Sequence, residues 1–215
     1  MPFAFLVGYL SAFVLEAQEL RSASDEATLS ADASRAIRGL IFVSLFGAYE
    51  RTVAGCVSTA VAQANAYAIP HRQLKAGLLP LALHSDATSV RGVSEAKFWD
   101  RCREFFAKAR SSEPAVLPDL FPKDGSFMRP TQLQLIWRVF DLPGDPWPDP
   151  RMIGRITELV DARNEIAHGS EPPSAVGGRY STGDLDQRIR DVEVLCSHII
   201  SVFQAECSRP VGFEV

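Results

Sequence analysis

The segment from Ser34 to Ala68 restricts the fold more than any other part of the chain. It contains no proline, and its apolar residues recur at the spacing of a helix. Pro70 follows closely and cannot continue a helix, because its ring clashes with the preceding turn and it lacks an N–H donor. We therefore predict one long central helix that Pro70 ends. Its apolar positions are Ile37, Leu40, Ile41, Leu45, Tyr49, Val53, Val57 and Val61.

Three glycines, Gly39, Gly47 and Gly55, recur every eight residues in this segment. Each costs up to ~1 kcal/mol relative to alanine inside a helix. Glycines at this spacing lie near one face, where they let another helix approach closely. No strand is expected before them, which excludes a phosphate-binding loop. We interpret them as positions of tight helix packing.

A second amphipathic helix is predicted from Ile153 to Gly169, with apolar residues at helical spacing. Its last turn carries Arg163, Asn164 and His168, and Gly169 stands where a left-handed helix end usually needs glycine. A guanidinium, an amide and an imidazole are costly to bury without partners. We therefore expect these three side chains to be solvated or to face something polar. The apolar stripe consists of Ile153, Ile156, Leu159, Val160 and Ala167.

The same residues carry a family resemblance. Arg163, Asn164 and His168 match the R-x4-H pattern of HEPN domains (higher eukaryotes and prokaryotes nucleotide-binding), in which a polar residue follows the arginine. The order of elements over roughly residues 35–205 also resembles the RiboL-PSP and MAE-type bacterial subgroups, including Ala48-Tyr49-Glu50 on the long helix. HEPN domains are all-helical, and many are metal-independent ribonucleases whose active site forms across a dimer. In these subgroups an acidic residue on the long helix can hydrogen-bond the motif arginine or histidine, a role that the resemblance gives to Glu50.

The rest of the chain is also expected to be helical. A first helix spans residues 2–22, an amphipathic helix runs from Ser94 to Arg110, and Asp184 caps a last helix with a full apolar stripe. Ser170 to Gly183 is predicted to be a flexible loop beside the motif. The predicted fold is all-α: one HEPN-like helical domain over residues 1–215, with a core at about 35–205. The long helix packs against the motif helix and the last helix, and residues 1–23 pack on this body.

Composition limits the classes of function. The formal net charge of −4 argues against a protein that coats nucleic acid, although an enzyme can still contact RNA at one site. Cys56, Cys102, Cys196 and Cys207 form no CxxC pair, so buried reduced thiols are expected and a zinc site is not. The apolar start of the chain lacks a basic region and is too short to span a bilayer. We expect a cytoplasmic protein with no membrane association, no cofactor and no metal.

RNA cleavage without a metal needs a base for the 2′-hydroxyl proton, a cation for the phosphorane and an acid for the leaving 5′-oxygen. Histidine suits both proton transfers near neutral pH, and arginine suits the phosphate. Asn164 and His168 are four residues apart and share a helix face, whereas Arg163 lies ~140° around from His168. One chain therefore presents an incomplete site. Two copies across a two-fold axis would bring two arginines and two histidines together.

Simpler interpretations of these residues remain open. His168 is favoured near the negative end of a helix dipole whatever its role, and Arg163 can pair with Glu158 or Glu165. Glu50 either supports the site or is a surface residue that pairs with Arg51. His71, His84 and His198 lack partners at metal or catalytic spacing, and His198 is expected to be a satisfied core or interface histidine.

The expected function is a metal-independent endoribonuclease acting as a homodimer on an RNA substrate, in a bacterial toxin–antitoxin or phage-defence setting. Arg163 would stabilise the transition state, His168 would transfer protons, Asn164 would position the substrate and Glu50 would support the site. HEPN toxins controlled by AMPylation carry a tyrosine two residues after the histidine, where this chain has Ser170. This departure counts against that form of control, but not against another antitoxin or partner protein. The alternatives are a non-catalytic HEPN module that binds a nucleotide or a partner, and a helical scaffold with no polar cleft.

Overall fold

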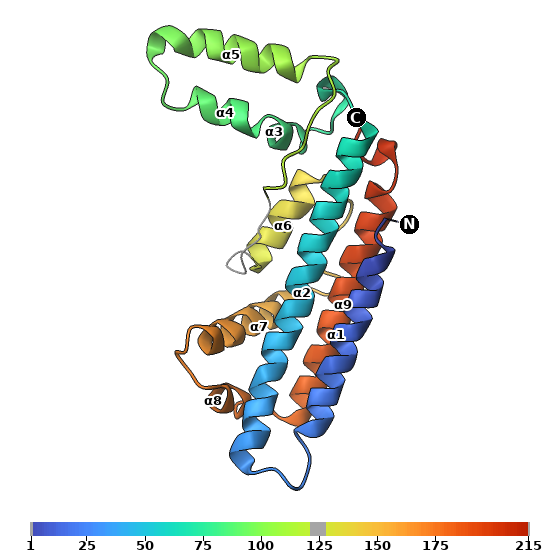
Figure 1. The fold of residues 1–215 in the computed structure, drawn as a ribbon, viewed down its shortest axis with the longest axis vertical. Coiled ribbons are helices and arrows are strands. Elements are labelled where there is room, and N and C mark those ends of the chain that lie inside the picture. Colours follow the sequence, from blue (N-terminus) through green and yellow to red (C-terminus); the bar gives the residue numbers. More distant parts are fainter. Residues whose placement is uncertain (1, 121–127, 215) are drawn as a thin grey trace.

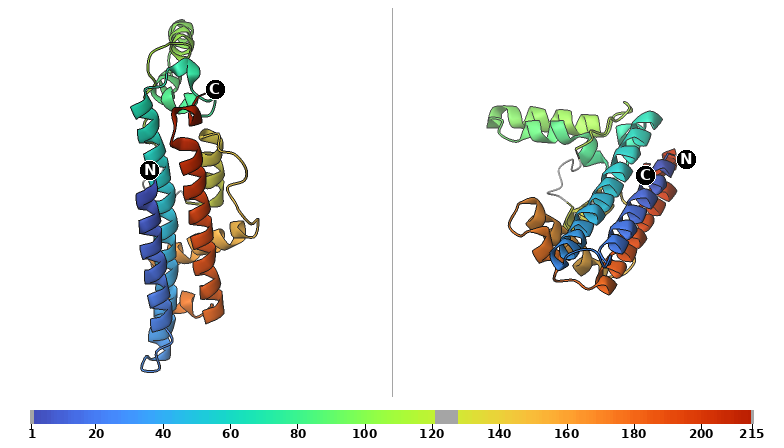
Figure 2. Two further views of the ribbon diagram at one scale, coloured as in Figure 1. Left: turned by 90° about the vertical axis from the view of Figure 1, so that its right-hand side faces the viewer. Right: turned by 60° about the horizontal axis from the view of Figure 1, so that its bottom comes forward.

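The fold of the described residues is all-α. The computed structural model describes residues 2–120 and 128–214, and within these ranges 71% helix and no strand is present. The helices α1 (Ala4–Ala23), α2 (Ala31–Tyr67) and α9 (Thr182–Cys207) run side by side, and further elements attach to one side of them (Figures 1 and 2). The prediction of an all-α protein is confirmed. The HEPN-like arrangement and the single domain over residues 1–215 stay predictions.

The long helix α2 (Ala31–Tyr67) lies at the centre of the contacts, as the proline-free segment predicted. The Ser30 side chain accepts a hydrogen bond from the Ala33 N–H and caps the helix start. At the other end, Ala68 adopts a left-handed conformation with φ +52°, two residues before Pro70. The helix α1 (Ala4–Ala23) packs along α2 and α9, which confirms that the N-terminal helix lies on the body. The buried residues of α1 recur at helical spacing: Leu6, Leu10, Val14 and Ala17.

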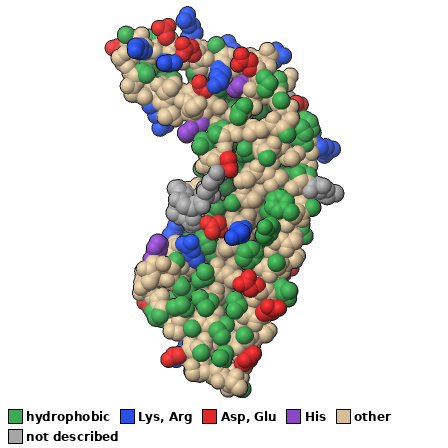
Figure 3. Space-filling view, in the orientation of Figure 1, with side chains coloured by type: hydrophobic (Ala, Val, Ile, Leu, Met, Phe, Trp, Pro, Cys, Tyr) green, Lys and Arg blue, Asp and Glu red, His purple; other side chains and the backbone are tan. Residues whose placement is uncertain are grey.

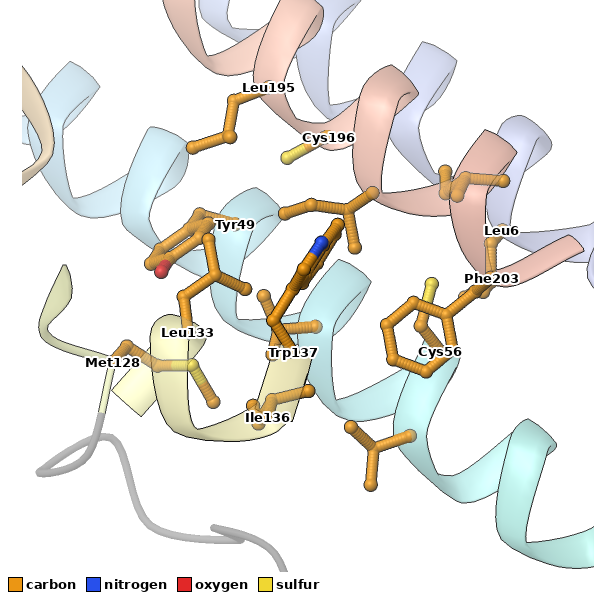
Figure 4. Packing of buried hydrophobic residues seen from close by; sticks show 14 of the residues in the cluster. Leu6, Tyr49, Cys56, Met128, Leu133, Ile136, Trp137, Leu195, Cys196 and Phe203 are labelled. Carbon is orange, nitrogen blue, oxygen red and sulfur yellow. The ribbon is translucent and has the colours of Figure 1, made fainter. Parts of the chain in front are cut away.

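The hydrophobic core lies between α2, α9 (Thr182–Cys207) and the shorter α6 (Pro130–Val139). Trp137 of α6 points into this core, where its ring meets Phe203 edge-on at a centroid distance of 6.0 Å (Figure 4). Tyr49, Cys56 and several aliphatic side chains complete the packing seen in Figure 4. The predicted stripe of the last helix is confirmed: Leu185, Ile189, Val192, Leu195, Ile199 and Phe203 are buried, and Val202 is partly buried.

Two helices lie on one side of α2. The helix α7 (Met152–Ala167) carries the motif at its C-terminal end, and the short helix α8 (Pro173–Gly177) follows it. The prediction of a flexible loop from Ser170 to Gly183 is wrong, because α8 lies flat against α2. A methyl group added at Gly39 would stand 2.1 Å from the carbonyl oxygen of Pro173. One added at Gly177 would stand 2.0 Å from the carbonyl oxygen of Arg35. Backbone contacts this close are possible only because both positions are glycine.

The glycine prediction holds for two of the three positions. Gly39 admits α8, and Gly55 admits the side chain of Leu6 from α1, whose nearest methyl would lie 2.5 Å from an added carbon. At Gly47 the nearest atom would be 3.9 Å away, which is ordinary contact. The cap of α9 also differs from the prediction. Ser181 is the capping residue, and Asp184 completes a capping box from the third helical position.

Two helices stand away from the rest of the chain, and we call α4 (His84–Val90) and α5 (Glu95–Ala109) the arm. The arm projects from the same side of α2 as α7 and α8 (Figure 1). The helix η1 (His71–Gln73) and α3 (Leu79–Ala82) connect α2 to it. The predicted amphipathic helix from Ser94 to Arg110 is confirmed as α5, but none of its residues is buried. Part of the connector that follows it, residues 121–127, lies outside the described residues.

The α2 helix is long and apolar enough to cross a membrane when only length and composition are considered. Within this chain 56% of its most apolar window is buried, and the buried core helix of a soluble protein passes the same test. All four cysteines are free thiols. Cys56, Cys196 and Cys207 are buried as predicted, whereas Cys102 on the arm is only partly buried. Burial raises the pKa of Cys196 and of Cys207 to about 12, so both thiols stay protonated.

Candidate functional site

The C-terminal end of α7 has the geometry that Gly169 predicted. Gly169 takes φ +70°, a left-handed conformation that disfavours other residues. Its N–H donates to the Ile166 carbonyl at 3.1 Å, and the Ser170 N–H donates to the Glu165 carbonyl at 3.0 Å. These two bonds form a Schellman motif, which fixes the helix end at His168. The position of His168 is therefore set by the backbone and not by contacts of its own ring.

Arg163 lies against the central helix. Its guanidinium carbon is 4.6 Å from the centre of the Phe46 ring, a cation–π contact with a residue that is 2% exposed. One Nη also donates to the Asn164 side-chain oxygen at 3.0 Å. Because that bond uses the amide oxygen, the amide N–H groups of Asn164 remain available as donors. Both side chains are half-buried. Arg163 is thus held in place while most of its donors have no partner among the described residues.

His168 is exposed, and its ring makes no hydrogen bond to any described residue. No hydrogen bond joins it to Arg163 either, in agreement with the ~140° between them on the helix. The structure thus places the three motif residues on one helix end, but it does not bring the arginine and the histidine of a single chain into contact. An acid, a base and a phosphate-binding cation are not assembled within one chain.

Glu50 lies on α2 one turn after Phe46, on the face that Arg163 covers. It is half-buried and forms no hydrogen bond or ion pair with Arg163, His168 or any other described residue. The role of Glu50 therefore stays a prediction, since among the described residues it pairs with neither the motif nor Arg51. Its neighbour Tyr49 is fully buried, and its hydroxyl has no hydrogen-bond partner among the described residues. Burial raises the pKa of Tyr49 above its ordinary value, so it stays neutral.

The two carboxylates that were expected to compete for Arg163 have other partners. Glu158 accepts hydrogen bonds from Arg188 of α9, including one from its Nε at 2.9 Å. Glu165 pairs with Arg179, which follows α8, at 2.7 Å. These pairs leave Arg163 without a neutralising carboxylate among the described residues. A positive charge that is positioned but not neutralised is what an anion-binding site needs.

A second polar group, which the sequence did not reveal, joins α7 to α9. Asp191 is 4% exposed, and it accepts hydrogen bonds from Arg155 at 2.5 Å and from Gln187 at 2.8 Å. Arg188 lies 3.7 Å from its other oxygen and links this pair to Glu158. The residues are 30 or more positions apart between the two helices, so no local pattern could have signalled the network. The network joins α7 to α9, in addition to the packing of α7 on α2.

Two of the three histidines outside the motif, His71 and His198, have structural partners. The ring of His198 stacks on Trp137 at 5.9 Å and contacts the Asp145 carbonyl at 3.1 Å, which confirms a satisfied histidine. His71 is buried, with its Nδ1 3.0 Å from the Glu113 carbonyl. The fold brings His71 and His84 to one pocket of about 450 Å³, where the arm joins the body. Among the described residues, no three His, Cys, Asp or Glu side chains group as metal ligands.

Comparisons with known proteins found no matching family model, no matching curated protein and no matching solved structure. The arguments about function therefore rest on the residues and their geometry.

Proposed function

We propose that this protein is a metal-independent endoribonuclease of the HEPN type, with an active site made from two copies of the chain. The unneutralised charge of Arg163 is the observation that carries this function. Its two nearest competitors, Glu158 and Glu165, pair with Arg188 and Arg179, and Phe46 holds its guanidinium in place. A fixed guanidinium with free donors matches two oxygens of a phosphate.

His168 supplies the proton chemistry. It is exposed and has no internal partner, so a substrate can reach either ring nitrogen. In the dimer, one His168 takes the proton of the 2′-hydroxyl while the 2′-oxygen attacks phosphorus. The bond from phosphorus to the 5′-oxygen breaks, and the second His168 gives that oxygen a proton. Arg163 binds the phosphorane oxygens, and the Asn164 amide donates to a neighbouring phosphate oxygen. The products are a 2′,3′-cyclic phosphate and a 5′-hydroxyl.

Cleavage of a labelled RNA in EDTA tests this function. Wild type is expected to leave cyclic phosphate ends, and His168→Ala and Arg163→Ala are each expected to cut at least about 100-fold more slowly. Glu165→Gln is a matched control on the same helix, because Glu165 pairs with Arg179 and not with the motif. Unchanged cleavage by His168→Ala protein would contradict the mechanism.

Mixing the two inactive variants tests the composite site. A dimer of Arg163→Ala chains has two histidines and no motif arginine, and a dimer of His168→Ala chains has the reverse. Mixed dimers carry one Arg163 and one His168, which can take the 2′-hydroxyl proton while water protonates the leaving 5′-oxygen, so mixing is expected to restore only part of the activity after subunit exchange. A site contained in one chain predicts no gain on mixing. Sedimentation of each protein shows whether it remains dimeric.

A non-catalytic HEPN module that binds a nucleotide or a partner protein is the second candidate. One observation favours it: Arg163, His168 and Glu50 form no internal acid–base pair among the described residues. Folded, dimeric wild-type protein that binds a labelled nucleotide but cuts no RNA would establish this alternative. For either function we place the protein in the cytoplasm, with an antitoxin or defence-system partner. The four free thiols agree with a reducing compartment.

A further inference from the structure

The outer face of the arm carries aromatic and arginine side chains in alternation. Trp99, Arg103, Phe106 and Arg110 follow one another at intervals of four, three and four residues, so they lie on one side of α5. We call these four residues the arm stripe. Trp99 is 73% exposed, Phe106 is 60% exposed and the Arg103 side chain is 82% exposed. Large aromatic residues this exposed are unusual on a soluble protein and indicate a binding surface.

The arm stripe is distinct from the residues that hold the arm together. Cys102 and Phe105 form a separate, partly buried row, and α5 packs against α4 and η1. The ring of Phe98 stands edge-on to Trp99 at 5.4 Å, and Phe105 stands edge-on to Phe106 at the same distance. Trp99 and Phe106 thus each contact a neighbouring aromatic ring and remain more than half exposed. Flat, exposed rings are suited to stacking.

The charge of the arm is opposite to that of the rest of the chain. Residues 84–110, which cover both helices of the arm and Arg110, contain six basic and four acidic residues, a formal charge of +2 in a chain of −4, so the remaining residues carry −6. Within the arm stripe, Arg110 has no ion pair with a described residue. Arg103 has only a 3.6 Å contact with Asp100, and both of those side chains are more than 70% exposed. Exposed pairs of this kind are weak, so both guanidiniums can bind another anion.

We propose that the arm stripe binds single-stranded nucleic acid, with bases stacked on Trp99 and Phe106 and phosphates bound by Arg103 and Arg110. Aromatic platforms combined with arginines are the usual means of binding single strands without sequence preference. Trp99 and Phe106 are about 10 Å apart along the helix, and Arg103 lies between them. A helix that lies on a membrane instead needs a continuous apolar face, which Arg103 interrupts here.

The position of the arm relates this surface to the candidate site. The arm and α7 project from the same side of α2 (Figure 1), and the surface is hollowed directly below the arm (Figure 3). The choice of RNA as the physiological strand rests on the proposed function. Binding to the arm stripe does not rest on it.

The test is fluorescence anisotropy with a labelled 12-nucleotide single-stranded RNA and full-length protein carrying His168→Ala, which removes cleavage. Trp99→Ala with Phe106→Ala is expected to weaken binding at least tenfold, because stacked bases lose their platform. Trp99→Phe retains a flat ring and is expected to retain most of the affinity. Phe5→Ala is the matched control, since Phe5 is 51% exposed on α1 and lies outside the arm stripe. Circular dichroism checks that each variant keeps its helix content.

Salt dependence tests the arginines separately. Arg103→Ala with Arg110→Ala is expected to lower the slope of log affinity against log salt by about 1.4, the value for two phosphate contacts on a single strand. Arg190→Ala, an exposed arginine on α9, is expected to leave the slope unchanged. Blunt duplex RNA of the same sequence is expected to bind more weakly, because its bases already stack on one another.

Equal RNA affinity of wild type and the Trp99→Ala, Phe106→Ala variant would overturn the proposal. A second result would also overturn it: the protein binds anionic vesicles in a way that depends on Trp99, but does not bind RNA. The two proposals can fail separately. If RNA binding depends on the arm stripe but the protein does not cleave RNA, only the proposed endoribonuclease function is refuted. If the protein cleaves RNA but its RNA affinity does not change when the arm stripe is mutated, only this inference is refuted.

Discussion

The contact between α2 and α8 offers the sharpest test of the packing, because Gly39 and Gly47 form a matched pair. Both are interior residues of α2, eight positions apart, so replacing either with alanine brings the same gain in helix propensity, about 1 kcal/mol. They differ in their surroundings. An added carbon at Gly47 lies 3.9 Å from its nearest neighbour, whereas one at Gly39 lies 2.1 Å from a backbone oxygen of Pro173.

The cost at Gly39 follows from that distance. Real carbon atoms do not approach an oxygen to 2.1 Å, and the oxygen belongs to backbone that cannot rotate away. Overpacking of this kind costs about 1–3 kcal/mol, because α8 must move off α2. We therefore expect Gly47→Ala to be up to about 1 kcal/mol more stable than wild type. Gly39→Ala should be about 1–3 kcal/mol less stable than Gly47→Ala, since the propensity gain cancels between them.

Equilibrium unfolding in urea measures both variants against wild type. The urea midpoint should be higher for Gly47→Ala than for wild type, and lower for Gly39→Ala than for Gly47→Ala. The dependence of the free energy of unfolding on urea concentration should be similar for all three proteins. Because α8 follows the motif directly, Gly39→Ala should also lower RNA cleavage if the proposed function holds. Equal stability of the two variants would refute the packing of α8 on α2, and with it the ordered structure between His168 and α9.

Three further outcomes are expected. Asp191→Ala should lower the free energy of unfolding in urea by roughly 3 kcal/mol, because it leaves Arg155 and Arg188 without their shared buried partner. A change below about 0.5 kcal/mol would mean that α7 does not depend on this network. Burial, together with Glu158, raises the pKa of Tyr180 to about 12 from 10.0. The neutral phenol therefore contributes fully to the free energy of unfolding below pH 10, and this contribution is lost as the pH rises through 12. The free energy of unfolding of wild type should therefore fall more steeply between pH 10 and 12 than that of Tyr180→Phe. Parallel plots of this free energy against pH for the two proteins would argue against the raised pKa. In native protein a thiol-reactive dye should modify Cys102 alone, and fast labelling of a second cysteine would contradict the burial of the other three.

The motif helix illustrates how far local pattern reaches. The end of α7 was predictable because glycine is the residue that takes a left-handed conformation without strain, and the Schellman bonds follow from that local geometry. The grouping of Arg163, Asn164 and His168 was predictable for the same reason, since four residues make about one helical turn. Their partners were not. That Glu158 and Glu165 are occupied, and that Phe46 holds Arg163, depends on residues more than ten positions away.

The loop after the motif illustrates the opposite case. Ser170 to Gly183 is rich in proline and glycine, which locally favours an irregular segment. The structure makes α8 there, because Gly39 and Gly177 let two backbones meet more closely than any side chain would allow. The sequence also predicted α5 as an amphipathic helix, yet Phe98, Trp99 and Phe106 remain exposed on the arm.

By itself, the sequence determined what local geometry controls: the all-helical class, the long α2 with its end near Pro70, and the motif at the end of α7. Only the tertiary structure decided which charges are neutralised, which glycines admit a neighbour and which apolar faces stay open to solvent. The physical reason is that helical periodicity acts over a few residues, whereas burial and charge pairing depend on which distant segments meet.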